Sequence, residues 1–348
     1  MSSGISRKAF LRATGVALAA TIAGCNSTTD NSGPNTNTQT SPETSPQSEQ
    51  QNDDSPTFGN FYVGNADTSS STVIDGRAEV VYTRPDTATD KSPVVMVPGL
   101  GLSPYIYRTT PDGRRGWVEY FAEAGHPVYV FNPPRNVDSG GLDTGSLQKS
   151  DSASLSRWSI ERAWPTWGFG PEVGDPYEDV RYLVESVDQL VASFPAYVST
   201  SGGGGGSRFA SPQETAALEA LLNRIGPSVL LVHSAGGGSG FAVAQTVPDL
   251  VERIVAVEPV GAPTDPQIVA EMGGDAPFMG VYGDYVGERG QTGRKEATQT
   301  TAELAGEVSP ASTLLSLPDE GVSGNTHLMM QDDNNGEIAD RIFTWIGD

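Results

Sequence analysis

An uninterrupted apolar run from Val229 to Val232 stops at His233 and Ser234 and is followed at once by small residues and glycines. Such a run is typical of a buried parallel strand, and the glycines allow a helix to begin within one turn of its end. A serine on so tight a turn projects its hydroxyl above the sheet, and the next backbone N–H, from Ala235, points to where an oxyanion would form. The segment therefore predicts a nucleophile elbow in an α/β fold.

The segment departs from the usual G-x-S-x-G pattern because Val232 replaces the first glycine. A glycine-rich turn between a strand and a helix of another doubly wound fold is therefore an alternative. Phosphate-binding loops are excluded. The chain has no G-x-x-x-x-G-K-[ST], and Phe241 stands where G-x-G-x-x-G needs its third glycine.

Of the three histidines in the chain, only His327 follows Ser234. A serine hydrolase with such an elbow carries its residues in the order serine, acid, histidine. His327 lies in a turn-rich loop between an expected strand, 312–317, and an expected terminal helix that ends near Trp345. A histidine there can reach the elbow as a general base. The alternative is a solvated loop histidine.

Two carboxylates compete for the role of the acid. Asp284 ends an expected strand, 280–284, and Glu258 ends another, 253–258. Both strand ends lie at the same edge of a parallel sheet as the elbow, so either side chain could orient the imidazole. Their placement alone does not choose between them.

Several blocks of sequence together resemble a small branch of bacterial esterases within the α/β-hydrolases. The blocks are Thr110–Trp117 with Tyr120-Phe121, His233-Ser234, Glu258-Pro259, and His327–Asp332 with Asn334-Asn335. The resemblance covers residues 57 to 348. It implies an α/β-hydrolase fold, in which helices flank a mostly parallel central sheet, and a triad of Ser234, Glu258 and His327. Asp284 then becomes a structural carboxylate, and the reaction requires no metal and no cofactor.

The expected oxyanion loop is Pro98-Gly99-Leu100-Gly101, where the resembled branch carries His-Gly-Cys-Cys. No disulfide can stiffen this loop. The N–H of Leu100 could still act as a donor beside that of Ala235, because glycines on both sides of Leu100 permit a close approach. A glycine-rich turn with no donor role is the alternative.

Residues 1–25 resemble an export signal. Arg7 and Lys8 precede an apolar run, 13–23, that is too short to cross a bilayer. The run leads into a lipobox-like Ile22–Cys25, so the only cysteine is the expected site of lipid attachment. Residues 26–56 are almost free of apolar side chains and are expected to form a disordered stalk. The predicted protein is therefore exported and anchored to the outer face of the cytoplasmic membrane by lipid alone, with a catalytic domain at 57–348.

The formal net charge is −22, with 43 acidic and 21 basic residues. This charge disfavours nucleic acid as a partner. It is typical of halophilic proteins, which stay soluble in strong salt, although an ordinary acidic secreted protein is the alternative.

Residues 133–227 separate the expected strand that ends at Asn132 from the elbow strand, which is far more than one crossover helix requires. We expect a cap at about 138–212. Its tryptophans, Trp158, Trp164 and Trp167, favour either a pocket for an apolar acyl or alcohol group or the cap's own small core. Apolar spacing predicts a helix within residues 178–198.

Together these patterns predict a serine esterase that forms an acyl-enzyme on a small-molecule ester, and they favour no oligomeric state. An acyltransferase or amidase that uses the same triad is an alternative. So is a surface binding protein on a hydrolase scaffold without activity.

Overall fold

The computed structural model describes residues 57–64, 76–87, 89–141, 147, 153–200 and 211–347. The predicted signal, the lipobox with Cys25 and the stalk lie outside the described residues, as do parts of the predicted cap. No helix in the described ranges is both long enough and apolar enough to span a membrane.

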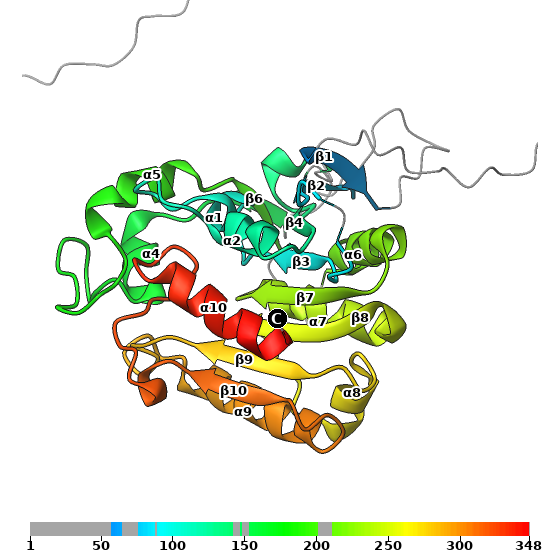
Figure 1. The fold of residues 1–348 in the computed structure, drawn as a ribbon. Coiled ribbons are helices and arrows are strands. Elements are labelled where there is room, and N and C mark those ends of the chain that lie inside the picture. The colour runs from blue at the N-terminus through cyan, green and yellow to red at the C-terminus, as the bar shows by residue number, and fades with distance from the viewer. Residues whose placement is uncertain are drawn as a thin grey trace, which may run out of the picture. The chain divides into compact units, whose positions relative to one another are not determined.

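Eight strands form one sheet in the order β1-β2-β4-β3-β7-β8-β9-β10 (Figure 1). β2 runs antiparallel to both of its neighbours, and every other neighbouring pair is parallel. The mostly parallel sheet predicted from the sequence is therefore present. The strands are β1 Phe58–Val63, β2 Ala78–Thr83, β3 Val94–Val97, β4 Val128–Asn132, β7 Ser228–His233, β8 Val251–Val257, β9 Phe278–Tyr282 and β10 Thr313–Ser316.

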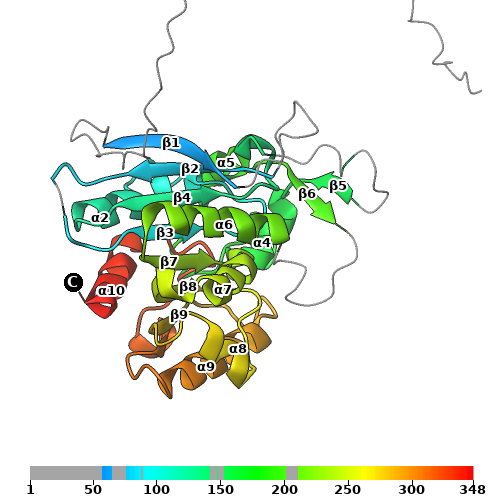
Figure 2. The ribbon, with the colours of Figure 1, turned by 90° about the vertical axis from the view of Figure 1, so that its right-hand side faces the viewer.

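The central strands are buried on both faces because helices cover both. In β7, Val229 and Leu231 point into one core, and Leu230 and Val232 point into the other, as strand alternation requires. α2 and α10 lie over the first face and α6, α7, α8 and α9 over the second (Figure 2). The helices are α1 Tyr105–Arg108, α2 Trp117–Glu123, α6 Pro212–Ile225, α7 Gly236–Thr246, α8 Pro266–Glu271, α9 Thr292–Gly306 and α10 Asn335–Ile346.

The long segment between β4 and β7 contributes α4 (Ile160–Trp167), α5 (Val187–Ala192) and two short strands. These strands, β5 (Ala153–Ser156) and β6 (Tyr197–Thr200), pair with each other outside the main sheet. The helix predicted within 178–198 forms only at 184–192, as a 3-10 turn (Val184–Ser186) followed by α5.

Tertiary contacts explain why the helix is this short. The backbone N–H of Arg181 donates to the carbonyl of Gly324 at 2.9 Å, and the Tyr182 ring stacks on Phe169 at a centroid distance of 4.3 Å. The apolar residues before α5 are therefore covered by other parts of the chain and not by a helix of their own. Pro195 then prevents α5 from continuing into β6.

Candidate active site

The predicted elbow forms where β7 ends and α7 begins. Ser234 has a φ of 51° and is partly exposed. Its carbonyl accepts hydrogen bonds from the N–H groups of Gly237, at 3.0 Å, and Val260, at 2.7 Å. A positive φ is strained for serine, so these neighbours hold the turn in place.

The valine in place of the first glycine is accommodated by a glycine farther along the elbow helix. Val232 is fully buried, and a Cβ added at Gly240 would overlap Val232 Cγ1. The helix can lie this close to the strand only because Gly240 has no side chain. The departure in the motif therefore leaves the geometry of the elbow intact.

His327 and Glu258 meet beside the elbow. His327 Nδ1 lies 2.6 Å from Glu258 Oε2, and both side chains are almost completely buried. An ionised carboxylate only accepts hydrogen bonds, so Nδ1 carries the proton and Nε2 is left as an acceptor. The His327 ring is 4.5 Å from the ring of His233, the residue before Ser234. The structure thus brings the predicted serine, acid and histidine to one edge of the sheet.

The hydroxyl of Ser234 makes no hydrogen bond within the described residues. The link between nucleophile and base is often long without substrate and tightens only when substrate binds.

Asp284, the rival acid, does not contact the imidazole. Its Oδ2 accepts a hydrogen bond from the N–H of Gly324 at 3.0 Å, and its own N–H donates to the carbonyl of Asn325 at 2.7 Å. Asp284 therefore fixes the backbone of the loop that carries His327. The geometry places Glu258 and not Asp284 against the His327 ring.

Arg289 is a site residue that the sequence reasoning missed. Its side chain is fully buried and forms two contacts with Glu258, Nη1 to Oε2 at 2.6 Å and Nη2 to Oε1 at 2.9 Å. Nothing in the local sequence around Arg289 marks it, because it reaches the carboxylate from the loop after β9.

The pKa values of Glu258 and His327 are both lowered, but for different reasons. Burial alone would raise the pKa of Glu258, but the charge of Arg289 and hydrogen bonds from His327 and Arg289 hold it well below its usual range. Burial lowers the pKa of His327, against the opposing effect of Glu258. At neutral pH the site therefore holds an ionised carboxylate and a neutral imidazole.

His233 contacts His327 through both its ring and its backbone. It is fully buried, and its Nε2–H donates to the backbone carbonyl of His327 at 2.9 Å. Burial lowers the pKa of His233 well below its usual range, so this ring is neutral as well.

A buried aspartate organises the loop around His327. Asp332 accepts hydrogen bonds from the N–H and hydroxyl of Thr326, at 2.7 and 2.8 Å, and from the amide of Asn325 at 2.9 Å. Burial raises its pKa to about 6, although these three donors favour the ionised form.

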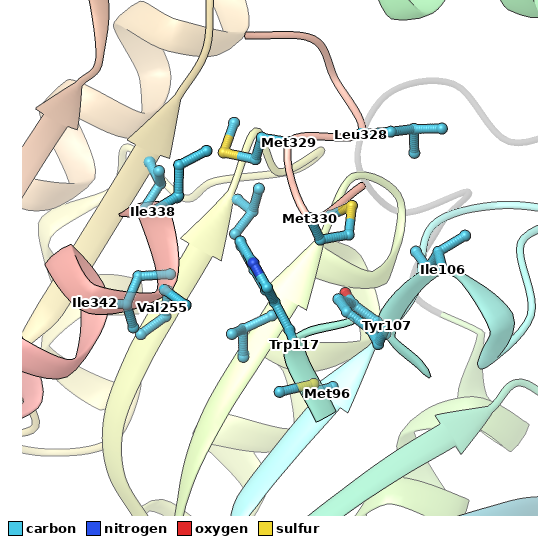
Figure 3. Close-up of a cluster of buried hydrophobic side chains, with 14 of the residues drawn as sticks. Met96, Ile106, Tyr107, Trp117, Val255, Leu328, Met329, Met330, Ile338 and Ile342 are labelled. Carbon is cyan, nitrogen blue, oxygen red and sulfur yellow. The ribbon is translucent and has the colours of Figure 1, made fainter. Parts of the chain in front are cut away.

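The loop before α2 and the first residue of α2 brace the segment after His327, which explains why both regions belong to the resembled blocks. Arg114 donates to the backbone carbonyls of Gln331 and Asp332 at 3.1 and 3.0 Å, and Trp117 Nε1 donates to the carbonyl of Asn335 at 2.9 Å. Figure 3 shows Trp117 within the buried apolar cluster that includes Met329 and Met330 of this segment.

The predicted oxyanion loop, residues 98–101, lies directly against the elbow. A Cβ added at Gly99 would be 2.8 Å from Ser234 Cβ, so only glycine permits this approach. Within the described part of the chain, the N–H groups of Leu100 and Ala235 donate no hydrogen bond.

The segment between β4 and β7 contacts both sides of the site. Trp158 Nε1 donates to the carbonyl of Leu100 at 2.6 Å, and the carbonyl of Trp167 accepts from the N–H of His327 at 2.8 Å. Trp158 is partly exposed, whereas Trp164 and Trp167 are buried in an aromatic cluster with Phe169. Of the three tryptophans, only Trp158 is partly exposed, and its ring packs against Trp167 at a centroid distance of 4.9 Å.

Among the residues that the structure describes, no group of three His, Cys, Asp or Glu side chains could hold a metal ion.

Comparison with known proteins gives two informative similarities. The chain is similar to a solved bacterial esterase, with 29% identity, a TM-score of 0.71, and coverage of 83% of this chain and 95% of the esterase. It is also similar to a probable secreted lipase, phiG, of a fungal species (strain ATCC 74256). These two chains are 27% identical over 322 residues, which cover 75% of this chain and 83% of the lipase. No family model matches the chain.

Proposed function

Because the chain belongs to the α/β-hydrolase superfamily, we propose that it is a serine esterase that hydrolyses a small carboxylic ester through an acyl-enzyme. The observation that carries the proposal is the buried hydrogen bond between His327 Nδ1 and Glu258 beside the elbow serine. The printed names of the two similar proteins, an esterase and a lipase, support the ester as the substrate class.

In the proposed mechanism Ser234 Oγ attacks the ester carbonyl while His327 Nε2 takes its proton. Glu258 keeps the imidazole in the required tautomer and stabilises the imidazolium. The N–H groups of Leu100 and Ala235 hold the tetrahedral oxyanion. His327 then protonates the leaving alcohol, and a water molecule repeats the sequence on the acyl-enzyme and releases the acid.

A screen of short- and long-chain p-nitrophenyl esters, in low and high salt, tests this proposal. We expect the wild-type protein to release p-nitrophenol and Ser234→Ala to release none above background. An added alcohol separates hydrolysis from acyl transfer, since a transferase would form a new ester. Equal release by the wild type and Ser234→Ala would refute the proposal.

The acidic composition gives the salt series a second purpose. We propose that the protein is halophilic, because a strongly charged surface repels itself unless salt screens it. Activity and thermal stability should then both rise from low to molar salt. An optimum at low salt would contradict this assignment.

We further propose that the protein is exported and anchored through Cys25 on residues 26–56. The signal-like sequence and the secreted status in the name of the similar lipase support export. In fractionated cells, Cys25→Ser should move the protein from the membrane to the soluble exported fraction. A protein that begins near Pro56 should keep the kcat of the full chain. Retention of exported Cys25→Ser in the membrane would contradict the anchor.

A further inference from the structure

Glu258 has four donors arranged around it. Oε2 accepts from His327 Nδ1 and Arg289 Nη1, both at 2.6 Å, and Oε1 accepts from Arg289 Nη2 at 2.9 Å and from the N–H of Gly283 at 3.0 Å. A carboxylate offers about four lone-pair sites, so this set fills it. The carboxylate cannot rotate away from His327 without losing one of these bonds.

Arg289 is itself held in one orientation. Its Nη2 also donates to the carbonyl of Asp284 at 2.8 Å, and its Nε donates to the carbonyl of Tyr285 at 3.3 Å. Tyr285 has a φ of 58°, which is strained for tyrosine. The chain therefore adopts an unfavourable backbone conformation at the turn that presents this guanidinium.

Stability alone does not explain this pair. Two charges lose most of their hydration when buried, and well-packed apolar residues of similar volume are often as stable or more so. A buried arginine that shares a carboxylate oxygen with the base is better explained by what it does to the base.

We propose that Arg289 is a positioning residue that fixes Glu258 for His327 and sets the pH range in which the imidazole is free to act as a base. The inference rests on the proposed esterase function. By neutralising Glu258, Arg289 weakens the attraction between the carboxylate and an imidazolium. His327 therefore stays neutral, and competent as a base, to lower pH than it would beside an uncompensated carboxylate.

The titratable and charged groups that face the pair come from several elements. They are Arg289 and Asp284 from the loop after β9, Arg294 from α9, Tyr282 from β9 and His233 from β7. His233 is neutral and burial raises the pKa of Tyr282, so neither changes charge near neutral pH. Arg294 also lowers the pKa of His327 but makes no contact with Glu258, and it therefore provides a matched control.

The test compares pH profiles of kcat/KM for Arg289→Lys, Arg289→Met and Arg294→Met with the wild type, on one ester. Arg289→Met loses the positive charge and the fork, which is the pair of Nη hydrogen bonds to Glu258. We therefore expect kcat to fall at least about tenfold. The acid limb, the rise of kcat/KM on the low-pH side of the profile, should move about one pH unit higher. Arg289→Lys keeps the charge and loses the fork, so kcat should fall while the limb stays near its wild-type position. Arg294→Met should move the limb less than Arg289→Met.

NMR of the three histidines gives a second readout that needs no turnover. In a Ser234→Ala background, the midpoint of the titration of the His327–Glu258 pair should lie at higher pH in Arg289→Met than with Arg289 present. If this variant does not fold, Arg289→Gln takes its place. Unchanged titration and an unmoved limb in a folded uncharged variant would overturn the proposal. If the wild type hydrolyses no ester, the proposed esterase function is refuted, but the titration still tests the role of Arg289.

Discussion

The proposed acid side of the site, around Glu258, and its proposed oxyanion side, around Leu100, are built in different ways. The orientation of the Glu258 carboxylate is fixed by four donors, three from the side chains of His327 and Arg289 and one from the backbone of Gly283. Around Leu100, position comes from the absence of side chains, because Gly99 lets the loop touch the elbow serine. The acid side should therefore be sensitive to charge and pH, and the oxyanion side to volume.

The largest expected loss in kcat comes from substitutions of Ser234 and His327, which lie between the two sides. Ser234→Ala and His327→Ala should each lower kcat by about 10⁴-fold or more, and the double variant should be little worse because the two act as a unit. Steady-state kinetics of the three purified proteins on one ester is the measurement. Additive losses in the double variant would contradict the shared role.

On the acid side, Glu258→Gln should lower kcat by about 10³- to 10⁴-fold, since an amide favours the wrong imidazole tautomer and stabilises imidazolium poorly. Asp284→Asn is the matched control, and its loss should be mild because its contacts are to the backbone of the histidine loop. A large loss in Asp284→Asn with near-normal Glu258→Gln would give the acid role to Asp284.

Glu258→Gln should also lower the free energy of unfolding, because it leaves the Arg289 charge buried without a charged partner. Removing one member of a buried pair costs about 3–5 kcal/mol. Denaturant unfolding should therefore show Glu258→Gln to be less stable than the double variant Glu258→Gln/Arg289→Met. Equal stability of the two proteins would mean that the pair is not desolvated as the structure shows.

On the oxyanion side, Gly99→Ala should lower kcat by about 10²- to 10³-fold, the cost of misplacing one oxyanion donor. The added methyl group would press on Ser234 and push the loop away. Gly293→Ala, at a helical position with nothing within 4 Å of the added Cβ, is the control and should behave like wild type. The acid limb of the pH profile should not move in Gly99→Ala. A moved limb would show that the two sides are not independent.

The smallest effect concerns Asp332, which braces the histidine loop. Its raised pKa means that the folded protein holds this proton more tightly than the unfolded chain. The free energy of unfolding should therefore fall as pH rises from about 4 to above 6, by about 3 kcal/mol for this group. Chemical denaturation across this range should show a shallower fall in Asp332→Asn. Parallel curves for the two proteins would argue against a raised pKa.

The parts of the site that are local in sequence were predictable. The elbow, the strand before Glu258 and the position of His327 each leave a pattern of apolar residues, glycines and turn formers, and the structure has these elements where the patterns predict them. The choice between Glu258 and Asp284 needed the resemblance to esterases, because both follow strands that end at one edge. The roles of these residues stay a proposal.

What the sequence could not predict depends on contacts between distant segments. Arg289 reaches Glu258 across 31 positions, and Arg114 reaches the histidine loop across more than 200. The segment before α5 carries helical spacing, yet Arg181 donates to the carbonyl of Ser323 and Tyr182 stacks on Phe169 instead. Gly240 shows the same principle at short range, since only the folded helix reveals that it makes room for Val232.

The strained backbone at Ser234, Glu258 and Tyr285 has a consequence for laboratory evolution. These are the only non-glycine residues with positive φ among the described residues, and they follow three neighbouring strands of the sheet. Glycine would relax the backbone at each of them. At Glu258 and Tyr285 it would also remove contacts, because Glu258 pairs with the buried Arg289 and the Tyr285 ring stacks on Tyr177. A library selected for heat resistance alone should therefore accept glycine at Ser234 and keep Glu258 and Tyr285. Selection for turnover at moderate temperature should keep all three, so the two regimes would differ at the Ser234 codon.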